Sequence, residues 1–363
     1  MESFAFIIHP LEPKADVARK YPRLARIVPT GLIHFLSEFW PPLVLSRVSG
    51  VRSAATGKEV EGWLLACPLT ARQMVRLPPA RAYRKIIQTG RLAERLGARI
   101  LGLGAFTSVV GDGGVTVART LTIPVTTGDS YTVAVVLETL LEAGRRLGIS
   151  PAGATAAVIG ASGAIGSASA RLLGPQVARL ILVGRDENRL RQVAAGVTQA
   201  DGSPPMVSTT LEAVREADLV LSATSAGRPL LFPEHLKAGA VVCDVARPHD
   251  VSPRVARERD DVLVVDGGLV EMPGGVNFRF DYTLPRHLTF ACMAETVTLA
   301  LEGRFEDYTL GKDLRPSQIA EIAGLAARHG FRPAPFYSFG RLLSDEEIEA
   351  VRRKAAATYG SVR

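Results

Sequence analysis

The chain has 363 residues, of which 47% are hydrophobic and 22% charged, an ordinary composition for a globular protein with two domains. Its 43 Lys and Arg against 36 Asp and Glu give a net charge of +7, which favours anionic partners, but no nucleic-acid-binding motif accompanies it. Three cysteines, Cys67, Cys243 and Cys292, lack metal-ligand spacing and indicate a reducing compartment, so no metal site is predicted.

The sequence shows no targeting or membrane-spanning segment. Its first residues lack a basic lead and a sustained apolar run, and no later stretch reaches the roughly 18 apolar residues that a membrane helix needs. We therefore expect a cytoplasmic protein with no membrane span and no nucleic-acid partner. Peripheral membrane contact stays open.

Residues 1–150 are predicted to form an N-terminal α/β substrate domain. Helical segments at about 79–97 and 131–147 flank the apolar stretch ARILGLGAFTSVV. Nearer the start, Phe35, Phe39 and Trp40 gather beside two prolines. Such a cluster can line an acyl tail or fill a corner of the core, and we interpret it as core.

The helical segment 79–97 is basic along one side. Eight basic residues and a single acid, Glu94, lie between Arg72 and Arg99. A helical wheel places four arginines opposite four small or apolar residues. The arginines are Arg84, Arg91, Arg95 and Arg99, and the opposite residues are Ile86, Gly90, Ala93 and Ile100. The stripe predicts either a dock for an acidic partner or a solvated face.

From about residue 154 to 268, short apolar runs alternate with helical segments. The runs are TAAVIG, RLILVG, ADLVLSAT, AVVCDVA and DVLVVDGG. Continuous apolar strands separated by helices indicate a parallel sheet covered on both faces. We therefore assign residues 151–285 to a Rossmann-type doubly wound α/β domain. Residues 286–363 turn helical again and are predicted to cross back to the first domain.

A glycine turn with the spacing G-x-x-G-x-x-G follows the first run. Glycines allow a tight turn and close backbone approach, and the next helix offers free N–H groups to a pyrophosphate. The predicted dinucleotide contacts here are Gly160, Ser162, Gly163, Ala164, Ile165 and Gly166. The alternative is a helix that begins on glycines for packing alone.

The residue after the second run indicates which dinucleotide binds. Arg185 stands where an NAD site usually has an acid, and a guanidinium suits the 2′-phosphate of NADPH. Asp186 would favour NAD if the strand ended one residue later, and Arg185 can also be a solvated loop charge. Thr224, Ser225 and Gly267 follow later strands and are predicted to contact the cofactor.

The stretch HLTFACMAETVTLALEG, residues 287–303, reads as an apolar helix that carries Cys292 and Glu295. Free cysteines usually pack in a core, so the residues alone leave the role of Cys292 open. Cys243 lies in a strand-like run and is predicted to be core, while Cys67, before a proline turn, is the rival thiol. The histidines outside this stretch show no pairing and are interpreted as structural. They are His9, His34, His235, His249 and His329.

Nine further stretches occur in a fixed order and span most of residues 37–333. They are LSEFWPP, ATGKEVEGWLLACPL, LGLGAFTSVV, TTGDSYT, VIGASGAIGSA, LILVGRDENRL, DGGLVE, FACMAE and AARHGFRP. This series resembles the cyanobacterial-type long-chain fatty acyl carrier protein reductases, which form aldehydes with NADPH. With ATSAG, it is also similar to the wider shikimate dehydrogenase and glutamyl-tRNA reductase superfamily.

The resemblance implies a nucleophilic cysteine in a Phe-Ala-Cys helix, which here is Cys292. It implies an acyl carrier protein or coenzyme A thioester as the donor, with the arginine stripe as the dock for the carrier. The resembling loops of the first domain carry Thr107, Ser108, Thr127 and Gly128, which are predicted to face the substrate. Three features depart from the family pattern: Asp129 stands where an amide is expected, the loop after Glu271 has a different sequence, and a tail follows HGFRPA. The identity of the acyl substrate is therefore left open.

A thiol suits this chemistry because an acyl thioester passes to another sulfur at little cost in free energy. Hydride addition then gives a thiohemiacetal, which releases an aldehyde. If the helix starts near residue 287, Cys292 lies more than one turn inside it, where the dipole helps little. We therefore predict that His287 or a group from the first domain assists thiolate formation, and that Glu295 orients the site.

The sequence thus predicts NADPH-dependent reduction of a long-chain acyl thioester to an aldehyde through an acyl-cysteine. Two alternatives stay open: a hydroxy-acid oxidoreductase like shikimate dehydrogenase, and a non-catalytic NADP(H)-binding interaction protein. The first is weakened because TLTIPVTTGD has no lysine after its TIP loop.

Overall fold

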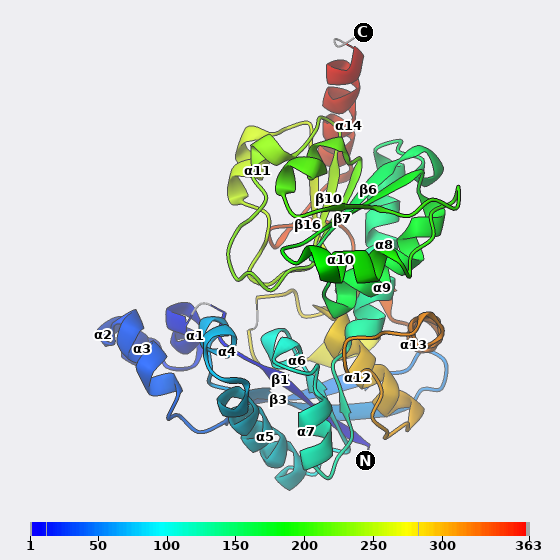
Figure 1. The fold of residues 1–363 in the computed structure, drawn as a ribbon. Coiled ribbons are helices and arrows are strands. Elements are labelled where there is room, and N and C mark those ends of the chain that lie inside the picture. The colour runs from blue at the N-terminus through cyan, green and yellow to red at the C-terminus, as the bar shows by residue number, and fades with distance from the viewer. Residues whose placement is uncertain (1, 12, 282, 361–363) are drawn as a thin grey trace. The chain divides into compact units, whose positions relative to one another are not determined.

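The computed structural model describes residues 2–11, 13–281 and 283–360. The chain forms two compact units (Figure 1). The first unit comprises residues 1–131, 270–314 and 320–332, and the second comprises 132–269, 315–319 and 333–363. These units and the predicted segments 1–150, 151–285 and 286–363 divide the chain at different residues. Helix α8 (Asp129–Arg146) falls almost wholly in the second unit, and the C-terminal residues contribute to both.

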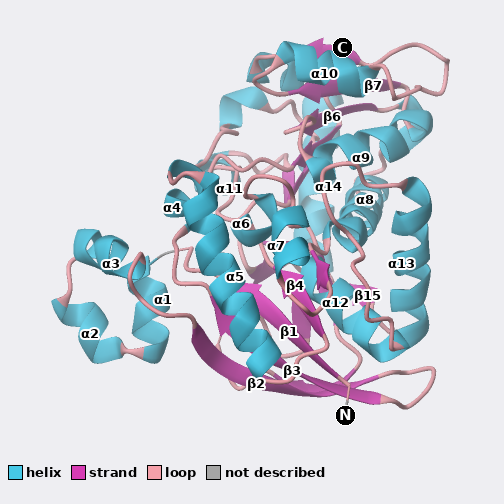
Figure 2. Cartoon of the chain, turned by 60° about the horizontal axis from the view of Figure 1, so that its bottom comes forward, coloured by secondary structure: helices cyan, strands magenta, loops and turns pink. Residues whose placement is uncertain are grey.

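A six-stranded sheet in the order β13-β2-β3-β1-β4-β5 forms the core of the first unit (Figure 2). Four neighbouring strands run parallel: β3 (Glu59–Ala66), β1 (Ser3–Ile8), β4 (Ile100–Leu103) and β5 (Val125–Thr126). The edge strands β2 (Leu43–Arg52) and β13 (Gly274–Asn277) add antiparallel pairs. The carboxyl ends of β1, β3, β4 and β5 therefore lie along the same edge of the sheet.

The two faces of this sheet are covered by different helices. Because side chains alternate along a strand, Ala5 and Ile7 pack with α5 (Pro79–Arg95) and α7 (Val115–Thr120), while Phe6 faces the opposite side. On that opposite side α12 (Ala291–Glu302) comes so close that a Cβ on Gly102 would lie 2.1 Å from Thr296 Oγ1. The predicted return of the C-terminal helical segment to the first domain is confirmed in α12.

Helix α12 starts later than the sequence analysis expects. Residues Leu288–Phe290 form strand β14, which joins β12 (Leu269–Glu271) in a small sheet, and Met272 N–H donates to His287 O at 2.9 Å. A strand cannot be part of the helix, so α12 begins at Ala291. The expected start near residue 287 is therefore wrong.

The second unit contains a parallel sheet of six strands in the order β11-β10-β9-β6-β7-β8. The strands are β6 (Thr155–Ile159), β7 (Arg179–Val183), β8 (Met206–Ser208), β9 (Leu219–Ser222), β10 (Val241–Asp244) and β11 (Leu263–Asp266). Numbered from β6, the order read from β8 is 3-2-1-4-5-6, the doubly wound arrangement of dinucleotide-binding folds. The predicted Rossmann-type α/β fold is confirmed.

Both faces of this sheet are buried, which explains the continuous apolar runs. On one face Ala157, Val220 and Val242 pack with Val255 of α11 (Pro253–Glu258). On the other, Cys243 Sγ lies 3.8 Å from Val136 O of α8. Helices α9 (Ala164–Leu173) and α10 (Glu187–Ala194) follow β6 and β7. The tail adds the hairpin of β16 (Tyr337–Ser338) and β17 (Arg341–Leu342), and then α14 (Asp345–Gly360).

Three short helices stand beside the sheet of the first unit: α1 (Pro13–Lys20), α2 (Pro22–Ile27) and α3 (Thr30–Ser37). Here Phe35 and Phe39 are 61% and 68% exposed, while Trp40 is half-buried. The interpretation of this aromatic cluster as core is therefore wrong for the two phenylalanines. In the described part of the chain, no helix has the length and apolar character needed to cross a membrane.

Candidate functional site

Cys292 is the second residue of α12, and its sulfur lies in the first turn of that helix. The backbone N–H groups of Cys292 and Met293 act to lower the pKa of this thiol and so favour the thiolate, as does the positive end of the helix dipole. Cys292 is partly buried, whereas Cys67 and Cys243 are fully buried. Cys292 is therefore the most accessible of the three thiols.

Burial and two carboxylates oppose thiolate formation at Cys292. Burial, together with the charges of Asp129 and Glu295, raises the pKa of the Cys292 thiol to about 12. Burial and the charge of Glu295 raise the pKa of Asp129 itself to about 7. At neutral pH the sulfur is thus protonated, and beside it stands a carboxyl group that exchanges its proton near pH 7.

The turn between β5 and α8 lies directly against Cys292. Glu295 is fully buried, and its carboxylate accepts hydrogen bonds from Thr126 Oγ1 at 2.5 Å and from the Tyr131 N–H at 2.9 Å. Between these two residues Gly128 has φ +76°, and a Cβ there would lie 2.2 Å from Cys292 Cα. Glu295 therefore fixes the turn that lies against Cys292.

The other predicted substrate residues follow neighbouring strand ends. Thr107 and Ser108 lie in α6 (Phe106–Val109), after β4, and their hydroxyls donate to Gly104 O and Ala105 O at 2.7 Å. The N–H of Thr127, after β5, donates to Thr309 O at 2.9 Å. The pairing of β4 with β5 brings both loops to one edge of the sheet.

The remaining candidates of the first unit lie in different surroundings. His287 is exposed and precedes β14. Cys67, after β3, is fully buried, and this burial raises the pKa of its thiol to about 11. In the second unit Cys243 is fully buried in β10, and burial likewise raises its pKa. Neither of these two thiols is accessible.

The arginine stripe is shorter than predicted. Arg84, Arg91 and Arg95 are exposed on α5, but the helix ends at Arg95 and Gly97 turns the chain with φ +78°. Arg99 therefore lies outside the helix, where its guanidinium stacks 3.8 Å from the ring centroid of Phe305. The placement of Arg99 on the stripe is wrong.

In the second unit, the glycine turn leads from β6 to the first turn of α9. Gly160 has φ +80°, and a Cβ on Gly166 would lie 2.3 Å from Gly160 O, so neither position accommodates a side chain. Gly163 is the N-cap of α9 and no side chain caps it. Ser162, Gly163, Ala164 and Ile165 are solvent-accessible. The first N–H groups of a ten-residue helix and a turn without side-chain bulk fit a pyrophosphate.

Arg185 and Asp186, in the loop after β7, have different surroundings. Asp186 is the N-cap of α10, and its Oδ1 accepts from the Arg189 N–H at 3.1 Å. Arg185 is exposed and forms no ion pair with any described residue. The acid thus serves the helix, and the guanidinium is available to an anionic ligand.

The last predicted cofactor contacts follow β9 and β11. Ser225 is exposed, while Thr224 lies close to the glycine turn, since a Cβ on Gly160 would be 3.2 Å from Thr224 Cγ2. Gly267 follows β11, and a Cβ there would lie 2.8 Å from Cys243 Sγ.

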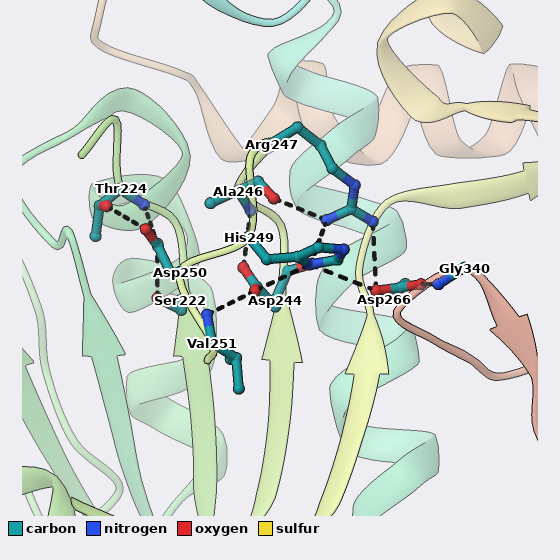
Figure 3. Close-up of polar contacts among 10 residues, drawn as sticks. All are labelled: Ser222, Thr224, Asp244, Ala246, Arg247, His249, Asp250, Val251, Asp266 and Gly340. Carbon is teal, nitrogen blue, oxygen red and sulfur yellow. Dashed lines mark hydrogen bonds and ion pairs between the residues drawn. The ribbon is translucent and has the colours of Figure 1, made fainter. Parts of the chain in front are cut away.

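A cluster of aspartates, which the sequence analysis missed, supports these strand ends (Figure 3). Asp250 accepts from Thr224 Oγ1 at 2.6 Å and from Thr224 N–H at 3.0 Å. His249 Nδ1 lies 3.2 Å from Asp244 Oδ2, and Asp266 accepts from the Gly340 N–H at 2.7 Å. The sequence did carry a signal for this cluster, an aspartate as the last residue of an apolar run, as in AVVCD and VLVVD.

Comparison with known proteins gives a consistent set of relatives. Residues 142–267 match the shikimate / quinate 5-dehydrogenase family. The chain is 34% identical over 313 residues to the aminotransferase PigE of Serratia sp., which covers 83% of this chain and 36% of PigE. It is 29% identical over 315 residues to the long-chain acyl-[acyl-carrier-protein] reductase of Synechococcus elongatus, which covers 82% of this chain and 89% of that protein.

A third relative is the glutamyl-tRNA reductase of Sorangium cellulosum, which is 28% identical over 197 residues. That match covers 52% of this chain and 34% of the relative. The chain thus spans about a third of PigE and of this reductase, but most of the acyl carrier protein reductase. These matches support the wider superfamily that the sequence analysis predicts.

Replacing Gly128 by alanine tests its contact with Cys292. We expect Gly128→Ala to lower the free energy of unfolding by about 3 kcal/mol, from the strain of a left-handed residue plus overpacking against a backbone atom. Gly148→Ala is the matched control, because Gly148 has φ +81° but nothing within 4 Å of its Cβ position. It should lose only about 1 kcal/mol in urea unfolding. Equal losses in both variants would refute the contact.

Replacing Asp129 by asparagine tests its raised pKa. Folded wild type keeps this proton up to about pH 7, whereas the unfolded chain releases it near the ordinary 3.8. The folded state therefore binds more protons between these values, and this carboxyl costs stability as the pH rises through that window. Asn cannot lose a proton, so Asp129→Asn should gain stability over wild type between pH 4 and pH 7 in urea unfolding.

The exposed Glu346 supplies the control for this measurement through Glu346→Gln. Asp129→Asn should also speed alkylation of Cys292 by iodoacetamide at pH 8, because removing the negative charge lowers the pKa of the thiol. Parallel stability curves for wild type and Asp129→Asn would contradict the assignment.

Proposed function

We propose that this chain, whose residues 142–267 match the shikimate / quinate 5-dehydrogenase family, is an NADPH-dependent oxidoreductase. We further propose that it reduces a long-chain acyl thioester to an aldehyde through an acyl-cysteine. The observation that carries the proposal is the position of Cys292, the most accessible thiol of the three, in the first turn of α12. The similarity to an acyl carrier protein reductase along most of that protein supports the substrate class.

Acyl transfer begins when Cys292 Sγ attacks the carbonyl carbon of the thioester. The sulfur must lose its proton in this step, and Asp129, with a pKa of about 7, is a suitable acceptor beside it. Protonation of Asp129 also removes the charge that opposes the thiolate. The bond between the acyl group and the carrier sulfur then breaks, and that sulfur leaves with a proton from Asp129.

The N–H groups of the first turn of α12 are placed to support negative charge. Those of Cys292 and Met293 act to lower the pKa of the thiol. When the sulfur becomes acylated, the dipole and the N–H groups of this turn stabilise an adjacent oxyanion. Glu295 is a positioning residue, since its carboxylate is occupied by Thr126 and Tyr131.

The cofactor is assigned to the second unit. The glycine turn and the first turn of α9 would hold its pyrophosphate, and Arg185 would hold the 2′-phosphate. A bound NADPH would supply a hydride for the acyl carbon. Cys292 would then serve as the leaving group when the aldehyde forms, and its sulfur would regain a proton.

The family match favours one other function, a hydroxy-acid dehydrogenase. That function has no use for a nucleophilic thiol, so it predicts full activity in Cys292→Ala. A non-catalytic protein that binds NADP(H) predicts cofactor binding without turnover. For the acyl donor we propose an acyl carrier protein or coenzyme A thioester, with Arg84, Arg91 and Arg95 as the dock for an acidic carrier.

Mass mapping of the acyl-enzyme tests the proposal directly. The protein is mixed with a long-chain acyl thioester while NADPH is withheld, and its peptides are analysed by mass spectrometry. We expect one acyl adduct on Cys292, because the other two thiols are buried, and its loss with release of aldehyde when NADPH is added.

Two variants control this experiment. Cys292→Ala should carry no adduct, whereas Cys67→Ala should be acylated like wild type. An adduct on Cys67 would move the nucleophile, and no adduct from either donor would overturn the acyl-enzyme mechanism.

Cofactor choice is tested at Arg185. Arg185→Gln removes a charged hydrogen-bond donor from the 2′-phosphate, so we expect the Kd of NADPH to rise about tenfold. The Kd of NADH should stay the same in isothermal titration. Arg257→Gln, another exposed arginine, is the control. Equal effects of Arg185→Gln on both dinucleotides would contradict recognition of the 2′-phosphate.

A further inference from the structure

Helix α3 presents an apolar row to solvent. Leu32, Phe35, Leu36 and Phe39 follow the spacing i, i+3, i+4, i+7, so they share one face of the helix and of the turn that continues it. They are 45%, 61%, 38% and 68% exposed, and the rings of Phe35 and Phe39 lie 5.3 Å apart. Ile27, just before this helix, is 82% exposed. We call these five residues the apolar row.

The opposite face of α3 is already anchored. Ile33 and Ser37 are buried, Ser37 Oγ donates to Gln73 Oε1 at 2.8 Å, and His34 Nδ1 lies 3.2 Å from Thr70 Oγ1. Thr70 and Gln73 begin α4 (Ala71–Arg76). Turning the apolar row inward would break these bonds, so its exposure follows from how the helix is held. An exposed cluster of this kind marks an interaction surface.

Basic side chains accompany the apolar row. Between residues 17 and 39 the sequence has four Lys and Arg residues and one acid, Glu38. Arg23 and Arg26 are exposed on α2, and Arg72 and Arg76 are exposed on α4 on either side of Val75, which is itself 61% exposed. None of these four arginines forms an ion pair with a described residue. Exposed arginines of α2 thus accompany the exposed apolar side chains of α3.

We infer that α2 and α3 form a docking surface for an anionic phospholipid bilayer. The apolar row enters the boundary of the acyl chains, and the arginines contact the phosphates of the headgroups. The three short helices stand out beside the sheet of their unit, so they offer a projecting edge rather than a groove (Figure 1). A second copy of the chain would bring the same arginines together, and their like charges would oppose the contact. This inference does not depend on the reduction of a thioester.

Vesicle sedimentation of the full chain tests the inference. We expect binding to vesicles of phosphatidylcholine with phosphatidylglycerol, weaker binding to phosphatidylcholine alone, and a decrease with added salt. The double variant Phe35→Ser/Phe39→Ser should lower the partition coefficient about tenfold or more, because two rings no longer leave water. Arg23→Gln/Arg26→Gln should lower binding only to the anionic vesicles.

The controls are Leu342→Ser and Arg257→Gln, exposed residues of the second unit, which should bind vesicles like wild type. Wild type that stays in solution with anionic vesicles would overturn the inference, as would equal binding by the phenylalanine variant. Self-association that requires Phe35 and Phe39, without vesicle binding, would assign the surface to a second copy and overturn it as well.

Discussion

The candidate site depends on the buried carboxylate of Glu295. A carboxylate without solvent is costly unless hydrogen bonds replace its water, and Thr126 and Tyr131 supply such bonds from the two ends of one turn. Because Thr126 ends β5 and Glu295 lies one turn after Cys292, a single side chain connects the edge of the sheet to helix α12. Gly128 then lies against Cys292 with no room for a side chain.

The same arrangement controls the charge of the sulfur. Its place in the first turn of α12 favours the thiolate, but burial and two nearby carboxylates outweigh that effect and raise its pKa to about 12. A neutral thiol reacts slowly with oxidants and alkylating agents. In the proposed reaction, Cys292 becomes a thiolate only when its proton passes to Asp129. The resting thiol is therefore protected from oxidants and alkylating agents, and the reacting thiolate is not.

In the second unit, the glycine turn depends on steric exclusion. Gly160 and Gly166 leave space only for backbone, so the turn closes tightly on the start of α9. Asp250 then holds Thr224 beside this turn, Asp244 anchors the loop after β10, and Asp266 holds the turn between β16 and β17. These aspartates support the carboxyl end of the sheet through backbone and hydroxyl groups.

The sequence by itself determined the local features. Alternating apolar runs predicted the parallel sheet because strands buried on both faces have no polar side, and the glycine spacing predicted the turn because only glycine fits it. The ordered series of motifs singled out Cys292. The tertiary structure alone decided where α12 begins, since Leu288–Phe290 pair as a strand with residues far away in the chain. It also decided that the charge of Asp129 acts on Cys292, that Arg99 leaves the stripe, and that Phe35 and Phe39 are exposed. Burial and partners depend on contacts distant in sequence, and periodicity within one segment carries no record of them.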